Sequence, residues 1–308
     1  MKKIILTILT AAALAFAVIA CKNVFSCRIP VGERGIADLE AHGDLELLFV
    51  GSSTFRSNLD IDLLDEDFDD SAYILAYGGN QYVACDIQYD EIKNRGGHKY
   101  DLLVLELDPL LLCEEVKLSD SRVIWDLSWD GKKRLWKSMS EGADVDFPLF
   151  YEYFVTSGID DLVTYPVTEP FYATRYKKGA KTDEAASPGA DVLENEKFDI
   201  SSIAPVAAQE EALVSLIEKC KEDGQPFVLL ECPHYHRLQD DLAYRKNLKY
   251  LTDLVKRTGA DMITAETVGF DNTNSEYYED MSHLSKAGRK EYTKALIPYL
   301  KALTSKTR

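Results

Sequence analysis

The chain has 308 residues and a formal charge of −17, because 52 Asp and Glu residues outnumber 35 Lys and Arg residues. Its hydrophobic share of 46% and charged share of 28% are typical of globular proteins and exclude disordered and fibrous classes. The acidic balance argues against nucleic acid as a partner, since binding phosphates requires a basic face. The length suits one large α/β domain or two small ones.

A secretory signal is predicted for residues 1–20. Lys2 and Lys3 are followed by an uncharged, mostly apolar run of 17 residues from Ile4 to Ala20, which is typical of a signal peptide. The run ends in Val-Ile-Ala before Cys21, which resembles the lipobox of bacterial lipoproteins and predicts lipidation of Cys21. An uncleaved anchor helix is the alternative, although the run is at the short limit for spanning a bilayer. Both alternatives place the rest of the chain outside the cytoplasm, tethered to a membrane.

Residues 21–44 are predicted to form a tether, and residues 45–305 a single folded domain. Near-continuous apolar runs indicate strands covered on both faces, as in a parallel sheet. The predicted strands are Leu45–Val50, Tyr73–Ala76, Leu102–Leu107, Phe227–Glu231 and Met262–Ala265, and the predicted helices include Glu210–Lys221, Leu238–Arg257 and Ser285–Leu303. This alternation predicts an α/β fold, a three-layer α/β/α sandwich around a mostly parallel five-stranded sheet.

Residues 117–204 depart from this alternation and are predicted to form a helical and loop insertion between the third and fourth strands. The segment is rich in aromatic residues and then becomes polar from Lys177 to Pro188. Long insertions in α/β enzymes usually cover the site and supply specificity. A surface embellishment without a role in the site is the alternative.

The first candidate for chemistry is Ser53, which lies in Gly51-Ser52-Ser53-Thr54-Phe55 directly after the first predicted strand. Ligands of parallel α/β sheets bind beyond the carboxyl ends of the strands, where a nucleophile is expected. A helix N-cap is the alternative role for a Ser in this position.

The second candidate is the pair Asp280 and His283, placed after the last predicted strand at the expected start of the last helix. The two are three residues apart, so both side chains reach one side of a turn. A His beside a carboxylate is what a Ser hydroxyl needs for activation. A helix cap and a surface residue of the first turn are the alternative roles. The strand-end Gly-Ser-Ser and the Asp-x-x-His at the far end of the same domain are more specific together than either is alone.

These two motifs resemble those of the SGNH (GDSL-like) hydrolase superfamily over about residues 45–303. The Gly-Ser-Ser variant resembles in particular its membrane-tethered envelope branch, which includes relatives of the D-alanylation protein DltD and of alginate O-acetylation proteins. The resemblance implies a flavodoxin-like sandwich. It also implies Ser53 as nucleophile, His283 as general base and Asp280 as the residue that orients the imidazole.

The resemblance also implies an oxyanion hole. Ala76-Tyr77-Gly78-Gly79-Asn80 resembles the second block of the family, so the N–H of Gly79, with Gly78 as second choice, joins the N–H of Ser53 as a donor. The third block departs from the family, because Tyr100–Pro109 contains no Asn where the family has Gly-x-Asn-Asp. Asp108 stands in this block, and an ionised Asp108 would repel an oxyanion. Asn80 is a candidate substitute for the missing donor, whose loss costs about 10²–10³ in rate.

Other residues are candidates for contact with a substrate. His234 and His236 follow the fourth predicted strand in Cys232-Pro233-His234-Tyr235-His236. Arg56 lies near Ser53, and Asp108 follows the third predicted strand. A metal site at the two His residues is an alternative, but no further ligands with zinc-like spacing accompany them. We expect neither a metal nor a cofactor.

An acidic run follows the candidate nucleophile. It comprises Asp60, Asp62, Asp65, Glu66, Asp67, Asp69 and Asp70. We expect a solvated helix face or loop that makes the rim of the site negative and disfavours a polyanionic substrate.

The sequence therefore predicts an extracytoplasmic, membrane-tethered serine esterase or O-acyltransferase that acts on an acylated carbohydrate or polymer of the cell envelope through an acyl-enzyme. For a transferase, the resemblance implies an integral-membrane partner that donates the acyl group. A non-catalytic envelope binding protein on the same fold is the alternative, favoured by the missing Asn, the acidic rim and the aromatic-rich insertion. A metal-dependent esterase that uses His234 and His236 is a third.

Overall fold

A parallel sheet of five strands forms the centre of the computed structural model, which describes residues 2–26, 35–95, 98–117, 120, 123–142 and 176–307. The strands are β1 (Leu45–Gly51), β2 (Ala72–Ala76), β3 (Tyr100–Glu106), β6 (Phe227–Leu230) and β7 (Met262–Ile263). Their order in the sheet is β2-β1-β3-β6-β7, and every neighbouring pair is parallel. All five predicted strands are confirmed, with ends that differ by at most two residues.

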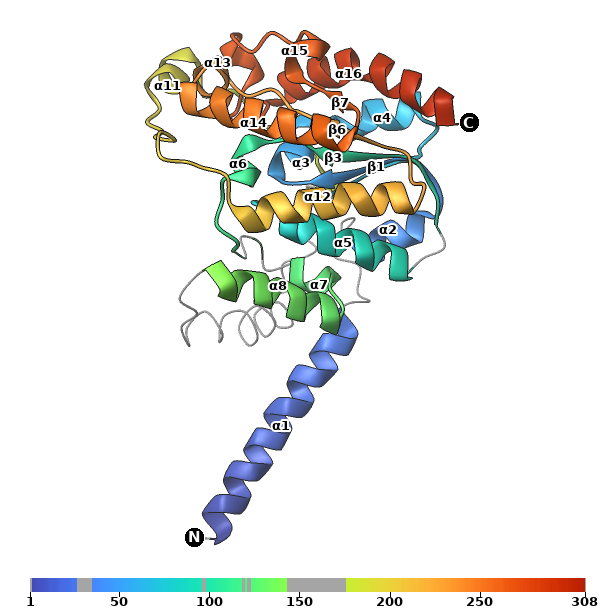
Figure 1. Cartoon of the computed structure of the whole chain (residues 1–308), viewed down its shortest axis with the longest axis vertical. Helices are drawn as coiled ribbons and strands as arrows, with labels where there is room; N and C mark the ends of the chain where they lie inside the picture. Colours follow the sequence, from blue (N-terminus) through green and yellow to red (C-terminus); the bar gives the residue numbers. More distant parts are fainter. Residues whose placement is uncertain are drawn as a thin grey trace.

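Helices cover both faces of this sheet (Figure 1). Alternate residues of β1 point to opposite faces, so Leu48 and Val50 pack in one core cluster while Leu47 and Phe49 pack in the other. The first cluster includes α5 (Tyr82–Arg95) and α12 (Ala207–Glu222), and the second includes α4 (Ile61–Asp67) and α16 (Lys286–Thr307). The predicted three-layer α/β/α sandwich is therefore confirmed.

The predicted helices Glu210–Lys221 and Ser285–Leu303 correspond to α12 and α16, but Leu238–Arg257 is divided in two. The chain forms α13 (His236–Gln239) and then α14 (Leu242–Thr258), because the Asp241 carboxylate accepts the N–H groups of Ala243 and Tyr244 and begins a new helix. The other helices of the described residues are α1 (Lys2–Ser26), α2 (Ile36–His42), α3 (Ser53–Asn58), α6 (Pro109–Leu112), α7 (Val123–Asp126), α8 (Trp129–Gly142), α11 (Ala190–Asn195), α15 (Ala265–Val268) and the 3₁₀ helix η3 (Ser275–Tyr277).

Helix α1 extends away from the sandwich at the N-terminal end of the chain (Figure 1). Cys21 lies within it. None of the helices in the described part of the chain is long and apolar enough to qualify as a membrane span. Secretion and lipidation of Cys21 stay predictions.

The described part of the insertion contains α7, α8, α11 and a two-stranded antiparallel hairpin, β4 (Tyr176–Lys177) and β5 (Ala180–Lys181). Its residues 143–175, which hold several of the aromatic side chains noted in the sequence, lie outside the described residues. The hairpin docks on the edge strand β2, since the N–H of Ile74 donates to the carbonyl of Lys178 at 2.9 Å. Gly179, at a φ of 82°, passes so close to the Ile74 carbonyl that a Cβ would collide with it. The insertion thus covers the edge strand β2 on the side that faces away from β1.

The acidic run is less negative than its sequence predicts. It forms α4 and the turn after it, and three lysines pair with its carboxylates. Lys177 pairs with Asp62 and Asp65, Lys178 with Asp65 and Asp70, and Lys301 with Asp67. Two of these lysines come from the hairpin of the insertion, far away in sequence, which is why the pattern of acidic residues alone overstated the charge of the rim.

Candidate active site

Ser53 is the first residue of α3, directly beyond the carboxyl end of β1. The capping role open to a Ser in this turn is taken by its neighbour, since the side chain of Ser52 accepts the N–H of Thr54 at 3.4 Å. The Ser53 hydroxyl instead lies 2.9 Å from Nε2 of His283. The chain turns at Gly51, so the Ser53 side chain lies beyond the carboxyl end of the sheet, where parallel α/β proteins bind ligands.

His283 lies between Ser53 and a carboxylate. Its Nδ1 is 2.8 Å from Oδ2 of Asp280, and Oδ1 of Asp280 accepts the backbone N–H groups of Ser282 and His283 at 2.7 and 2.8 Å. Burial opposes ionisation of Asp280, but the His283 contact and the two N–H donors outweigh it and lower the pKa of Asp280 to about 2. The ionised carboxylate holds the Nδ1–H tautomer, which leaves Nε2 free to accept the Ser53 proton.

The turn that carries Asp280 and His283 ends before the last helix. Helix α16 begins at Lys286, and the turn is closed by an isolated bridge between Tyr278 and Leu284. The expectation that Asp280 opens this helix is therefore wrong. The Asp-x-x-His spacing instead suits a turn in which the Asp side chain accepts the N–H groups two and three residues later.

Asn58, the last residue of α3, holds this turn against the helix that begins with Ser53. Its Nδ2 donates to the carbonyl of Ser282 at 3.0 Å, and its Oδ1 accepts the N–H of Leu284 at 2.8 Å, so its amide bonds both neighbours of His283. Its side chain is fully buried. Asn58 was missed from the sequence, where an Asn five residues after a Ser carries no signal.

The strand register brings the turns that carry the candidate oxyanion donors to the same end of the sheet. Gly51 pairs with Ala76 in the β1–β2 ladder, so Ser53 and Gly78 each come two residues after the last pair of the ladder. Gly79 has a φ of 63°, a left-handed conformation that favours glycine in the turn. The roles of the N–H groups of Ser53, Gly79 and Gly78 stay predictions.

Asn80 does not replace the missing third donor. Its Nδ2 donates to the Gly51 carbonyl at 3.0 Å and to Oε1 of Gln88 at 2.9 Å, and its side chain is buried. The amide protons are thus engaged inside the protein. Asn80 supports the turn that carries the nucleophile, because one of its acceptors is the carbonyl of Gly51 at the end of β1.

Asp108 and His234 are also buried and do not line a substrate site, contrary to the prediction. His234 Nε2 lies 3.3 Å from Oδ2 of Asp108, while Oδ1 of Asp108 accepts the N–H of Leu110 at 2.7 Å and caps α6. His234 is 1% exposed and Asp108 5% exposed. The Asp108 carboxylate is therefore engaged by partners of its own, and the predicted repulsion of an oxyanion loses its basis.

His236 has a different partner from His234. Its Nε2 lies 2.9 Å from Glu194, so the two imidazoles bind separate carboxylates. Within the described residues, no group of three or more His, Cys, Asp or Glu side chains is arranged to hold a metal ion. The metal site considered from the sequence therefore finds no support in this pair.

Arg56 lies in α3, and its side chain faces the hairpin of the insertion. Its guanidinium carbon is 5.7 Å from the centroid of the Tyr176 ring, and its Nη2 is 3.5 Å from the point where a Cβ on Gly78 would lie. The insertion hairpin thus delivers an aromatic side chain to the surroundings of the predicted oxyanion turn.

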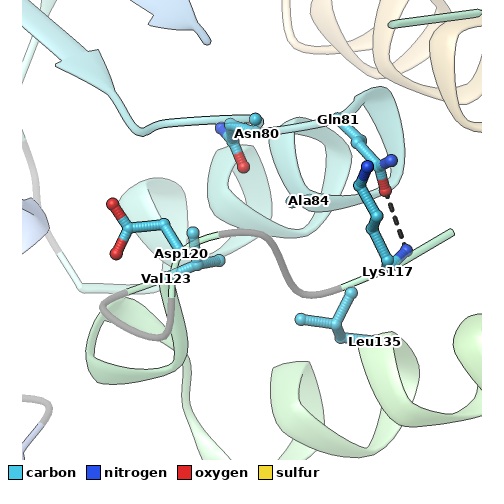
Figure 2. Close-up of a pocket in the computed structure, with 8 residues that line it drawn as sticks. Asn80, Gln81, Ala84, Lys117, Asp120, Val123 and Leu135 are labelled. Carbon is cyan, nitrogen blue, oxygen red and sulfur yellow. Dashed lines mark hydrogen bonds between the residues drawn. The ribbon is translucent and has the colours of Figure 1, made fainter. Parts of the chain in front are cut away.

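A small cavity adjoins the same turn (Figure 2). It is lined by Gly79, Asn80, Gln81, Ala84, Lys117, Asp120, Val123 and Leu135. Figure 2 shows Lys117 beside Gln81, the residue before α5, where the N–H of Lys117 donates to Oε1 of Gln81 at 3.1 Å. The insertion therefore supplies one wall of the cavity and the turn after β2 the other.

No family model matches the chain, and no curated protein matches it. Among solved structures, it is similar to Axe2, an acetylxylan esterase from Geobacillus stearothermophilus, with 14% identity over 84% of this chain and 95% of that one and a TM-score of 0.39. A Streptococcus pneumonia protein provisionally named a platelet activating factor has 13% identity over 97% and 99% of the two chains and a TM-score of 0.40. A Parabacteroides merdae protein provisionally named a GDSL-like lipase has 12% identity over 85% and 97% and a TM-score of 0.38. Likenesses this distant carry no argument about activity, which is therefore argued from the geometry of the site alone.

Proposed function

We propose that this protein is a serine ester hydrolase or O-acyltransferase of the SGNH type. The observation that carries the proposal is the line of hydrogen bonds from Asp280 through His283 to Ser53, at the carboxyl end of a parallel sheet. Each contact is 2.8 or 2.9 Å, and the order of carboxylate, imidazole and hydroxyl is the order that activates a serine nucleophile.

In the proposed reaction, Ser53 Oγ attacks the carbonyl carbon of an ester while its proton passes to Nε2 of His283. Asp280 stabilises the imidazolium that forms. The N–H groups of Ser53 and Gly79 bind the oxyanion until it collapses, and His283 returns the proton to the departing alkoxide. The acyl-enzyme is then attacked by water or by a carbohydrate hydroxyl, which His283 deprotonates in the same way.

We further propose that the substrate is an acyl ester of a cell-envelope carbohydrate or polymer, and that the protein is tethered to the membrane outside the cytoplasm. The predicted signal and the lipobox that ends at Cys21 support this location. In the transferase form, an integral-membrane partner supplies the acyl group.

The test is labelling of the full-length protein with a fluorophosphonate, together with hydrolysis of short-chain aryl esters. We expect Ser53→Ala to abolish both and His283→Ala to slow both strongly. Matched controls are Ser71→Ala and His98→Ala, because both residues precede strands and therefore lie at the amino end of the sheet, opposite Ser53. The controls should behave as the wild type.

Absence of Ser53-dependent labelling, together with absence of ester turnover, would refute the enzyme and favour the non-catalytic envelope binding protein. Loss of activity in a chelator would favour the metal-dependent alternative. For an active protein, a carbohydrate acceptor that increases product release and appears acylated in the product identifies a transferase, whereas free acid alone identifies a hydrolase.

A further inference from the structure

Glu106, the last residue of β3, has its side chain beneath the nucleophile turn. Val50 pairs with Leu105 in the β1–β3 ladder, which places Glu106 beside Gly51. A Cβ on Gly51 would lie 2.8 Å from the Cβ of Glu106, so the absence of a side chain at Gly51 is what admits the Glu. Glu106 is 2% exposed. The Glu106 carboxyl group is therefore enclosed in the core, against the turn that carries Ser53.

The Glu106 carboxyl binds the residues on both sides of Ser53. Its Oε2 accepts the backbone N–H of Ser52. Its Oε1 lies 2.9 Å from Oγ of Ser52 and also contacts Oγ1 of Thr54. The two hydroxyl oxygens are themselves 2.9 Å apart. Glu106 Oε1, Ser52 Oγ and Thr54 Oγ1 thus form a closed three-oxygen ring.

Counting protons indicates which form of Glu106 fits this ring. Three oxygen–oxygen contacts need three protons, and the hydroxyls of Ser52 and Thr54 supply two. With an ionised carboxylate, one of the contacts brings two lone pairs together without a proton. With a protonated carboxyl group, every contact has one donor and one acceptor.

The surroundings favour the same form. Burial, followed by the charge of Asp108, raises the pKa of Glu106 to about 8, although the donors on Ser52 and the charge of His234 oppose the shift. The acid is therefore neutral at physiological pH and loses its proton in mildly alkaline solution.

We propose that Glu106 is a positioning residue for the nucleophile and that it acts as a neutral acid, whose proton closes the three-oxygen ring and fixes the turn that aims Ser53 at His283. This rests on the proposed function of Ser53. When the proton is lost, the ring opens and Ser53 loses its alignment. Since Glu106 is buried and touches the turn rather than a substrate, the loss appears in kcat and leaves KM nearly unchanged.

Other titratable groups face Glu106 from three elements. They are Asp108 beyond its own strand, His234 and Cys232 in the loop after β6, and Tyr82 and Cys85 in α5. Burial raises the pKa values of Cys232, Tyr82 and Cys85, which keeps them neutral in mildly alkaline solution. Burial opposes protonation of His234, but Asp108 and the other carboxyl groups nearby raise its pKa, and its imidazole lies against Asp108. Of these groups, Glu106 is the one whose side chain binds the residues on both sides of Ser53.

The experiment compares Glu106→Gln with the wild type as full-length proteins. Fluorophosphonate labelling rates, kcat and KM are measured from about pH 6 to about pH 10, which spans the transition expected of Glu106. Above the transition, the wild-type kcat and labelling rate should fall by about tenfold for each pH unit, because the fraction of molecules that keep the single Glu106 proton falls by this factor. Glu106→Gln should remove this fall, because its amide accepts the Ser52 N–H through Oε1 and donates to a hydroxyl through Nε2 at every pH.

Glu231→Gln is the matched control. Glu231 is also buried, and burial raises its pKa to about 7, but its carboxylate accepts the N–H of Ala265 at 3.0 Å, at the end of a different strand. This variant should keep the alkaline fall. The proposal is overturned if Glu106→Gln shows the same fall as the wild type, if the wild type shows none, or if Glu231→Gln removes it.

A second readout separates this proposal from the proposed function. The folded chain holds a proton on Glu106 that the unfolded chain releases above its ordinary pKa of 4.5, so the wild type should lose thermal stability relative to Glu106→Gln as the pH rises toward about 8. If no variant is labelled at any pH but this relative loss is seen, the enzyme proposal fails and the neutral acid stands. If labelling depends on Ser53 but the relative stability does not change with pH, the neutral acid is wrong.

Discussion

Asn58 offers the sharpest test of how the two halves of the proposed triad are held together. Replacing it with Ala removes both hydrogen bonds that fix Ser282 and Leu284 on either side of His283. The amide lies in the core, and Leu284 is fully buried, so its N–H loses its partner without access to water. An unsatisfied buried polar group costs about 1–3 kcal/mol, so two of them predict a loss of about 2–6 kcal/mol in the free energy of unfolding.

The catalytic effect should be separable from the loss of stability. Without the amide, the turn is free to shift relative to α3, and a displacement of about 1 Å between reacting groups costs about 10² in rate. Asn58→Asp is an intermediate variant. Its carboxylate still accepts the Leu284 N–H, but an oxygen takes the place of the Nδ2 donor and faces the Ser282 carbonyl. We expect the free energy of unfolding in a denaturant titration to decrease in the order wild type, Asn58→Asp, Asn58→Ala. The rate of fluorophosphonate labelling should decrease in the same order.

The control for this experiment is Asn247→Ala. Asn247 is also a buried Asn and donates to the Ile203 carbonyl at 3.3 Å, but it lies in α14 rather than beside the triad. It should lose stability and keep the wild-type labelling rate. If Asn58→Ala is destabilised yet labels as fast as the wild type below its melting temperature, the amide has no positioning role and the reasoning is wrong.

Two further substitutions test other parts of the site. Asp280→Asn should lower kcat by about 10⁴, because an amide no longer holds the Nδ1–H tautomer of His283. Since the pKa of Asp280 is lowered to about 2, its carboxylate is ionised throughout the working range, and the measured loss should be the same at every pH where the wild type is active. Lys178→Met should lower the free energy of unfolding by about 3 kcal/mol in a denaturant titration, because it leaves the nearly buried Asp65 with one lysine instead of two. A Met variant as stable as the wild type would show that the hairpin is held by its backbone contacts with β2 alone.

The strands were predictable because each is a local pattern. A run such as Leu102–Leu105 is apolar without interruption, which is typical of a strand covered on both faces. The three residues of the triad were also recognisable, since Ser53 follows a strand and the spacing of Asp280 and His283 suits one turn. The helix break at Asp241 was missed, because its capping carboxylate also fits inside an uninterrupted helical pattern.

The supporting residues were not predictable, because their roles depend on pairs far apart in the sequence. Glu106 meets Ser52 only because of the register between β1 and β3, and Asn58 meets the His283 turn only because α3 packs beside it. The same applies to Asp108 and His234, two polar residues whose pattern suits a substrate site until the structure shows them buried against each other. A single sequence records which residues are present but not which ones pair.

These contacts divide the proposed site into a fixed part and a variable part. Helix α3 carries Ser53 at its first residue and Asn58 at its last, so six residues set the distance between the nucleophile and the turn that holds the base. Glu106 and Asn80 support the start of this helix from inside the core. The insertion instead brings Tyr176 to Arg56 and lines the cavity beside Gly79. If the proposed acyl-enzyme forms, water and a carbohydrate hydroxyl would attack the same intermediate, so we expect substitutions in the insertion to change acceptor preference without altering the contacts among Asp280, His283 and Ser53.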